Sequence, residues 1–184
     1  MFTPKVSLNT KALQEMELDL RECFDRLFEL QFQLKRTLAQ YSDGKLLKGN
    51  ELVGWLGEVY VKLLYDGCLV SDKYEHDVET KWGWRISVKT RTGDGSGWKQ
   101  SSAIPKLNGE GCPTHFAFVH LCNNYRLDRI WLYCWPDLCA SNRFRPKYVR
   151  GQFRSYIFKL DEAKDRDCLV YCSSDIALPT IEQG

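Results

Sequence analysis

The chain has 184 residues, of which 43% are hydrophobic and 27% are charged. This length and composition are typical of one folded globular domain and exclude a disordered or fibrous chain. The net charge is only +2, so the field of the whole molecule does not indicate a polyanionic partner and the local distribution of charge has to be considered.

No segment approaches the roughly 18 consecutive apolar residues that span a bilayer, and residues 1–10 lack the basic and apolar regions of a secretion signal. We therefore expect a cytoplasmic protein with no membrane partner. The eight cysteines are irregularly spaced, and six of them have large apolar or aromatic neighbours. This pattern predicts reduced, mostly buried thiols.

A segment without proline or glycine runs from Leu8 to Tyr41, and its apolar residues recur every three or four positions. This spacing predicts one long amphipathic helix within an N-terminal element that covers residues 1–45. Two hypotheses are open: the helix packs on its own domain, or it forms the seam of a homodimer. The main apolar stripe is Leu13, Met16, Leu20, Cys23, Leu27, Leu30, Leu34 and Tyr41, and a second stripe is Phe24, Phe28 and Phe32.

Residues 46–175 are predicted to form an α/β domain. It begins with a helix over 51–65, because the apolar residues there keep helical spacing after a suitable N-cap at Asn50. Three short segments with turn signals between them follow at residues 68–70, 77–80 and 84–90, and we expect them to be strands.

The second half of this domain begins after a flexible loop at residues 93–97. Two β-rich segments, 115–122 and 130–135, are separated by a polar turn and should be adjacent central strands. The other expected elements are a short helix at 98–104, a short helix at 136–138, a strand at 156–160 and a loose tail at 176–184.

Asp77 and Lys89 are the residues of this domain that first indicate chemistry. A turn is predicted at residues 81–83 between them, so a β-hairpin would put both side chains at the same end of adjacent strands. Alternation along the second strand places Ser87 on the same face as Lys89 and leaves Ile86 and Val88 to face the core.

Phosphodiester hydrolysis explains why a carboxylate and a lysine would converge there. Mg²⁺ prefers carboxylate oxygens, and it polarises the phosphate and activates the attacking water. A lysine beside the metal can orient that water and offset the charge that develops on the phosphate. Glu58, on the helix before the first strand, is a second candidate acid.

The ordered set of motifs resembles the PD-(D/E)xK nuclease superfamily over roughly residues 50–135, and within it small restriction-endonuclease-like proteins of microbes and phages. The motifs are Trp55-Leu56-Gly57-Glu58, His76-Asp77-Val78 and Ile86-Ser87-Val88-Lys89-Thr90-Arg91.

This resemblance implies a restriction-endonuclease-like fold, with a mixed central β-sheet flanked by helices, and a Mg²⁺-dependent nuclease site in which Mn²⁺ can substitute. Glu58 and Asp77 would hold the metal, the Val88 carbonyl could add a ligand, and Lys89 would be the catalytic lysine.

Ser87 departs from the pattern, because the family has a second acid at this position. A serine hydroxyl is a weak ligand for Mg²⁺, so another acid would have to compensate. Glu51 lies seven residues before Glu58 on the same helical face, and Glu79 lies two residues after Asp77 on the same strand face. The alternative is a noncatalytic nucleic-acid-binding module of the same fold.

Basic and aromatic residues are concentrated around the Lys89 motif, as nucleic acid would require. The residues fit DNA or RNA backbones equally, and DNA is the expected substrate, in restriction or defence. Residues 140–154, rich in arginine and aromatics, are where we expect specificity. The expected nucleic-acid contacts are Arg85, Arg91, Trp98, Lys99, Gln100 and Lys106.

Two further hypotheses belong to other classes. A zinc site would use Cys134 and Cys139, or Cys168 and Cys172, with a histidine, but these spacings differ from the usual tight knuckle and favour structural thiols. An oligomeric interaction scaffold would use the N-terminal helix and have no affinity for DNA.

Overall fold

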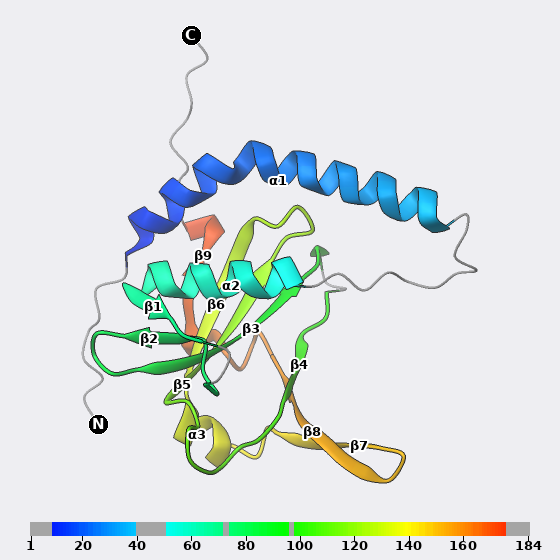
Figure 1. Ribbon diagram of the computed structural model, residues 1–184. Coiled ribbons are helices and arrows are strands. Elements are labelled where there is room, and N and C mark those ends of the chain that lie inside the picture. Colours follow the sequence, from blue (N-terminus) through cyan, green and yellow to red (C-terminus); the bar gives the residue numbers. More distant parts are fainter. Residues whose placement is uncertain (1–8, 40–50, 72–73, 96–97, 176–184) are drawn as a thin grey trace.

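The computed structural model describes residues 9–39, 51–71, 74–95 and 98–175 (Figure 1). Its helices are α1 (Thr10–Ala39), α2 (Glu51–Leu64) and α3 (Trp135–Ala140), with short 3₁₀ turns at Arg166–Cys168 and Ser173–Asp175. Its strands are β1 (Gly67–Leu69), β2 (Val78–Thr80), β3 (Arg85–Thr92), β4 (Ser101–Ile104), β5 (His115–Leu121), β6 (Leu127–Cys134), β7 (Arg145–Val149), β8 (Gln152–Lys159) and β9 (Leu169–Cys172).

Six strands form a mixed sheet in the order β1-β2-β3-β5-β6-β9. The β1–β2, β2–β3, β5–β6 and β6–β9 pairs are antiparallel, whereas β3 and β5 are parallel. The long connection between β3 and β5 allows this parallel pairing, which a tight turn cannot make. The predicted α/β class, the long N-terminal helix and the adjacent β5 and β6 strands are confirmed.

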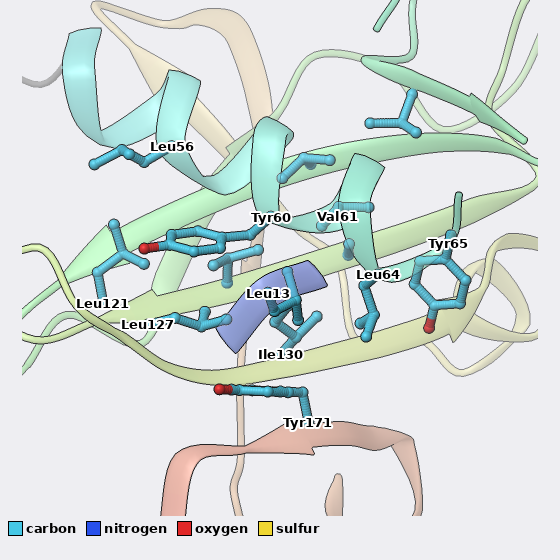
Figure 2. Packing of buried hydrophobic residues seen from close by; sticks show 14 of the residues in the cluster. Leu13, Leu56, Tyr60, Val61, Leu64, Tyr65, Leu121, Leu127, Ile130 and Tyr171 are labelled. Carbon is cyan, nitrogen blue, oxygen red and sulfur yellow. The ribbon is translucent and has the colours of Figure 1, made fainter. Parts of the chain in front are cut away.

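Helices α1 and α2 cover one face of this sheet (Figure 1). Figure 2 shows this packing: Tyr60, Val61 and Leu64 of α2 and Leu13 of α1 lie in one cluster against the sheet, where Leu13 is beside Ile130 of β6. All five of these side chains are fully buried. Burial of large apolar side chains contributes roughly 1.5–3 kcal/mol each, so this layer supplies much of the stability of the domain.

The other face of the sheet is covered by α3 and by a second sheet of three strands, in the order β4-β8-β7. This second core is mostly aromatic. Phe116 and Phe118 of β5 pack against Phe158 of β8 at ring distances of 5.2 and 6.0 Å. β3 therefore separates two cores, and its side chains alternate between the helices and the small sheet.

α1 follows the predicted stripe only over its first half. Leu13 and Phe24 are buried, and Met16, Leu20 and Leu27 pack partly against the same core. Leu30 is 63% exposed and Phe32 is 59% exposed, although both belong to predicted stripes. The helix thus packs on its own domain, and the homodimer seam stays a prediction.

Several local predictions were wrong. Residues 98–104 do not form a helix, because Ser101–Ile104 pair with β8 as strand β4, with Ser102 and Ile104 turned inward. β7 and β9 were not predicted. All eight cysteines are free, but none is buried, and Cys23, Cys68 and Cys134 are exposed. The Asn50 cap and the tail at 176–184 lie outside the described residues.

Two glycines of α2 provide a matched test of the contact between this helix and β3. A Cβ at Gly57 would lie 1.9 Å from the Thr90 hydroxyl oxygen, whereas a Cβ at Gly54 would meet nothing within 4 Å. We expect Gly57→Ala to lower the free energy of unfolding by about 1–3 kcal/mol through overpacking, and Gly54→Ala to raise it by about 0.5–1 kcal/mol through helix propensity. Urea unfolding followed by circular dichroism measures both, and equal stabilities of the two variants would contradict this packing.

Candidate active-site cleft

Asp77 lies directly before β2, and its amide donates a 2.9 Å hydrogen bond to the Ile86 carbonyl of β3. Its carboxylate lies beside the next residues of β3. Oδ2 accepts a hydrogen bond of 2.6 Å from the Val88 amide and lies 3.5 Å from the Ser87 hydroxyl. The β2–β3 hairpin therefore brings Asp77 and Ser87 together.

Asp77, Ser87 and Lys89 line one cleft of about 140 Å³. It lies on the face of the sheet that carries β4 and α3, opposite α1 and α2. Two residues of that layer, Ile104 and Trp135, form part of its wall. The cleft is thus bounded by the central sheet on one side and the smaller sheet on the other.

Lys89 is half-buried in this cleft. Within the described ranges, its ammonium makes no hydrogen bond or ion pair with another residue. A partly desolvated ammonium without an anion beside it is unfavourable. The cleft therefore offers a positive charge to a bound anion.

The Val88 carbonyl faces the same edge of β3 as the Asp77 carboxylate. In a strand, the amide and carbonyl of one residue point to the same edge, and the Val88 amide is bonded to Asp77. The paired part of β2 reaches β3 only as far as Ile86. A carboxylate oxygen and a carbonyl oxygen thus converge just past the end of β2.

Glu58 does not line the cleft with Asp77, since α2 lies on the other face of the sheet. Its position on the helix nevertheless places it toward the same edge. Residues two apart on a helix lie about 200° apart, and the Tyr60 hydroxyl bonds Glu17 of α1, on the β6 side. Glu58, half-buried, therefore lies on the flank of α2 nearer β1 and β2, one residue after Gly57, which faces Thr90 of β3.

Glu51 and Glu79 were the acids expected to compensate for the missing carboxylate at Ser87, and Glu79 is poorly placed for this. It is exposed and pairs with Arg85, so it lies toward the end of β3 away from Lys89. The side chain of Glu51 is outside the described part of the chain. The structure brings a different acid, Glu75, into the cleft.

The sequence did not indicate Glu75, because it precedes Asp77 by two residues in a bend before β2, where strand alternation does not apply. Glu75 forms an ion pair of 3.0 Å with Lys106, and the Lys106 ammonium also donates to the Glu110 carbonyl at 3.0 Å. Lys106 is therefore a cleft residue, as well as a predicted contact to nucleic acid.

The other predicted contacts are more scattered. Arg85 is half-buried and lines a second, more open hollow of about 750 Å³, which shares Pro113 with the cleft. Lys99 is exposed. Gln100 is half-buried and its side-chain amide donates to Glu162 at 2.9 Å.

Arg91 and Trp98 are placed differently from what their predicted role requires. The Arg91 guanidinium donates to the Ser101 carbonyl at 2.8 Å and to the Ser102 hydroxyl at 3.0 Å, and burial lowers its pKa. It ties β4 to β3. Trp98 is only 6% exposed and stacks on His120 at 3.9 Å, so its ring belongs to the second core and is not presented to a base.

The zinc hypothesis gains no support from the described residues, in which no three histidine, cysteine or acidic side chains form a group that could hold a metal. His120 has both ring nitrogens engaged at 2.8 Å, by Asp128 and by the Gly93 carbonyl. The hydrogen bond from His120 is the main cause that lowers the pKa of Asp128 to about 2.

Within the described ranges, no helix is long and apolar enough to cross a membrane.

No protein-family model and no curated protein matches this chain. The function has to be argued from the cleft.

Proposed function

We propose that the protein is a Mg²⁺-dependent endonuclease that hydrolyses DNA phosphodiester bonds, with the reaction centred on Asp77 and Lys89. The observation that carries this proposal is that Asp77 and Lys89 line one cleft beside the end of β2, where the Asp77 carboxylate is bonded to the Val88 amide and the Val88 carbonyl faces the same edge of β3. The mixed sheet flanked by helices is compatible with the restriction-endonuclease-like fold expected from the motifs.

The donor set fits Mg²⁺, which proteins usually hold through one or two carboxylates while it keeps several waters. Asp77 and the Val88 carbonyl would hold it, with waters in the remaining positions. Within the described residues Asp77, Glu58 and Glu75 do not form one group, so Glu58 would have to approach from the other face of the sheet, or Glu75 to leave Lys106, to compensate for Ser87. When bound, the metal supplies a Lewis acid for the phosphate and lowers the pKa of the attacking water.

Lys89 has the chemistry to act on the phosphate itself. Its ammonium can orient the attacking water through a hydrogen bond and offset the negative charge that develops on the phosphate oxygens. The cleft is partly desolvated, so this charge acts in a lower dielectric than water and has a larger effect.

Asp77 has a second role as an organiser of β3. Its hydrogen bond with the Val88 amide fixes the backbone immediately before Lys89. A charged acceptor strengthens this bond, so the carboxylate also holds the position from which the lysine side chain extends.

The test is cleavage of a supercoiled plasmid and of single-stranded DNA and RNA by the full chain, with Mg²⁺ or Mn²⁺ and with EDTA. We expect the metal to convert the plasmid to nicked or linear forms and EDTA to abolish the conversion. Adding Mg²⁺ back to the EDTA sample controls for irreversible loss of protein.

A noncatalytic DNA-binding module would bind the plasmid in this experiment and leave it intact with either metal. Cleavage of RNA alone would retain the chemistry but replace the substrate. Cleavage that persists in EDTA would contradict the proposed metal dependence.

A further inference from the structure

The β7–β8 hairpin lies in an unusually basic part of the chain. Residues 141–160 contain six arginine and lysine residues and no aspartate or glutamate. Removing these six from the chain's 26 basic residues leaves 20, against 24 acidic residues. The hairpin segment therefore provides the positive charge of a molecule that is otherwise acidic.

The hairpin projects from the body of the protein, at the end of the smaller sheet (Figure 1). All five residues of β7 are exposed, as are the first three of β8. Arg150 and Gly151 form the turn with φ of 51° and 78°, the positive values of a tight two-residue hairpin turn. A basic side chain thus sits at the tip.

One face of the hairpin carries a row of aromatic rings that continues out from the second core. Phe153 lies 4.9 Å from Tyr156 and 6.1 Å from Tyr148, between ring centres. Tyr148 is 62% exposed and Phe153 is 47% exposed. Arg145 and Lys147 alternate with the aromatic positions along β7 and so lie on the other face.

Two residues that line the candidate active-site cleft contact the base of the hairpin. Ile104, which lines the cleft, pairs directly with Tyr156 of β8. Trp135, which also lines the cleft, packs against Phe144, just before β7, at 5.6 Å. A ligand bound in the cleft would therefore lie next to β4, the strand that pairs with β8 of the hairpin.

Arg143 fixes this base and is not part of the charged surface. Its guanidinium pairs with Asp165, which is 2% exposed, and donates to the Lys159 carbonyl at 2.9 Å. The four residues Arg145, Lys147, Arg150 and Arg154 are exposed, and within the described ranges none makes an ion pair.

We propose that the β7–β8 hairpin is a binding arm for duplex DNA, which it holds across the cleft. A two-stranded ribbon fits the major groove of B-DNA, about 12 Å wide, and the hairpin extends roughly 13 Å beyond Tyr156 at about 3.3 Å per residue. The four exposed basic residues contact phosphates, and Tyr148 and Phe153 contact sugars and base edges. The choice of DNA as the ligand rests on the proposed function, but the inference concerns binding of the duplex and not its cleavage.

The test replaces Arg145, Lys147, Arg150 and Arg154 by glutamine and measures binding of a labelled 30-base-pair duplex in EDTA, over a range of salt concentrations. The slope of log affinity against log salt should fall by about 0.9 for each phosphate that is no longer neutralised, so by roughly three to four in total. We expect the affinity to fall by at least about tenfold at 100 mM salt. The matched control replaces Lys11, Arg26, Arg36 and Lys62, which lie on α1 and α2, and should keep the wild-type slope.

The inference is overturned if the hairpin variant keeps the affinity and slope of the wild type, or if the control variant is weakened as much. Binding to phosphatidylserine vesicles in place of the duplex would also overturn it. Because binding is measured without metal, the experiment can contradict the DNA-binding arm without contradicting the nuclease, and the reverse. A wild type that binds through the hairpin but never cuts would refute only the nuclease, and a hairpin variant that cuts as fast as the wild type would refute only the arm.

Discussion

Replacing Lys89 by alanine is expected to lower the rate of DNA cleavage by about 10²–10³-fold, while duplex binding changes by no more than about twofold. Lys89 provides a positive charge inside the cleft, whereas the other cleft lysine, Lys106, is paired with Glu75. Loss of one preorganised group that stabilises developing charge has an effect of this size. Single-turnover cleavage at saturating protein measures the chemical step, and the salt titration in EDTA measures binding.

Lys81 is the matched control. It is a lysine of the β2–β3 hairpin, as Lys89 is, but it lies in the turn, where its side chain is 60% exposed and paired with Asp66. Lys81→Ala removes the same charge and should cut at the wild-type rate. Lys89→Arg separates charge from geometry: it keeps a cation on a longer, planar group and should recover part of the rate. Unchanged cleavage by Lys89→Ala would disprove the assignment of the cleft.

Replacing Asp77 by asparagine is expected to reduce cleavage by at least about 10²-fold and to weaken binding of Mn²⁺ to the free protein. Asparagine keeps an oxygen that can accept the Val88 hydrogen bond, so stability should change by less than about 1.5 kcal/mol. It removes the negative charge that Mg²⁺ and Mn²⁺ require. Electron paramagnetic resonance of free Mn²⁺ measures the binding directly, without DNA.

Glu79→Gln is the control for this variant, since Glu79 lies in β2, two residues after Asp77, but opposite Arg85 and away from Lys89. It should bind Mn²⁺ and cut DNA as the wild type does. If Asp77→Asn bound Mn²⁺ with unchanged affinity, the metal would have to lie elsewhere, and Glu58 and Glu75 would be the next residues to test.

Local patterns were sufficient to predict α2 and the β2–β3 hairpin that carries Asp77, Ser87 and Lys89. The apolar periodicity of α2 and the alternation of Ile86 and Val88 against Ser87 and Lys89 each depend on residues close in sequence. The turn at residues 81–83 fixes the pairing of β2 with β3, and this register alone places Asp77 beside Ser87. Short-range geometry therefore determines this part of the site.

Long-range contacts explain the predictions that failed. Ser101–Ile104 have no strong preference for strand, and they become β4 because β8 lies beside them. Trp98 has the composition of an exposed platform, but it is buried because Trp131 and His120 complete a core around it. Arg91 lies two residues after Lys89 in β3, so strand alternation places both on the same face of the sheet. Its role differs because Ser101 and Ser102 of β4 accept hydrogen bonds from its guanidinium.

The sequence by itself determined the α/β class, the order of the principal elements and the pairing of Asp77 with the β3 motif, because these follow from periods of two and 3.6 residues and from one tight turn. Only the tertiary structure decided which acid joins the cleft, which basic residues face solvent and where the β7–β8 hairpin lies. Those outcomes depend on packing between segments far apart in the sequence, as in the pairing of Ile104 of β4 with Tyr156 of β8, and no local pattern encodes such contacts.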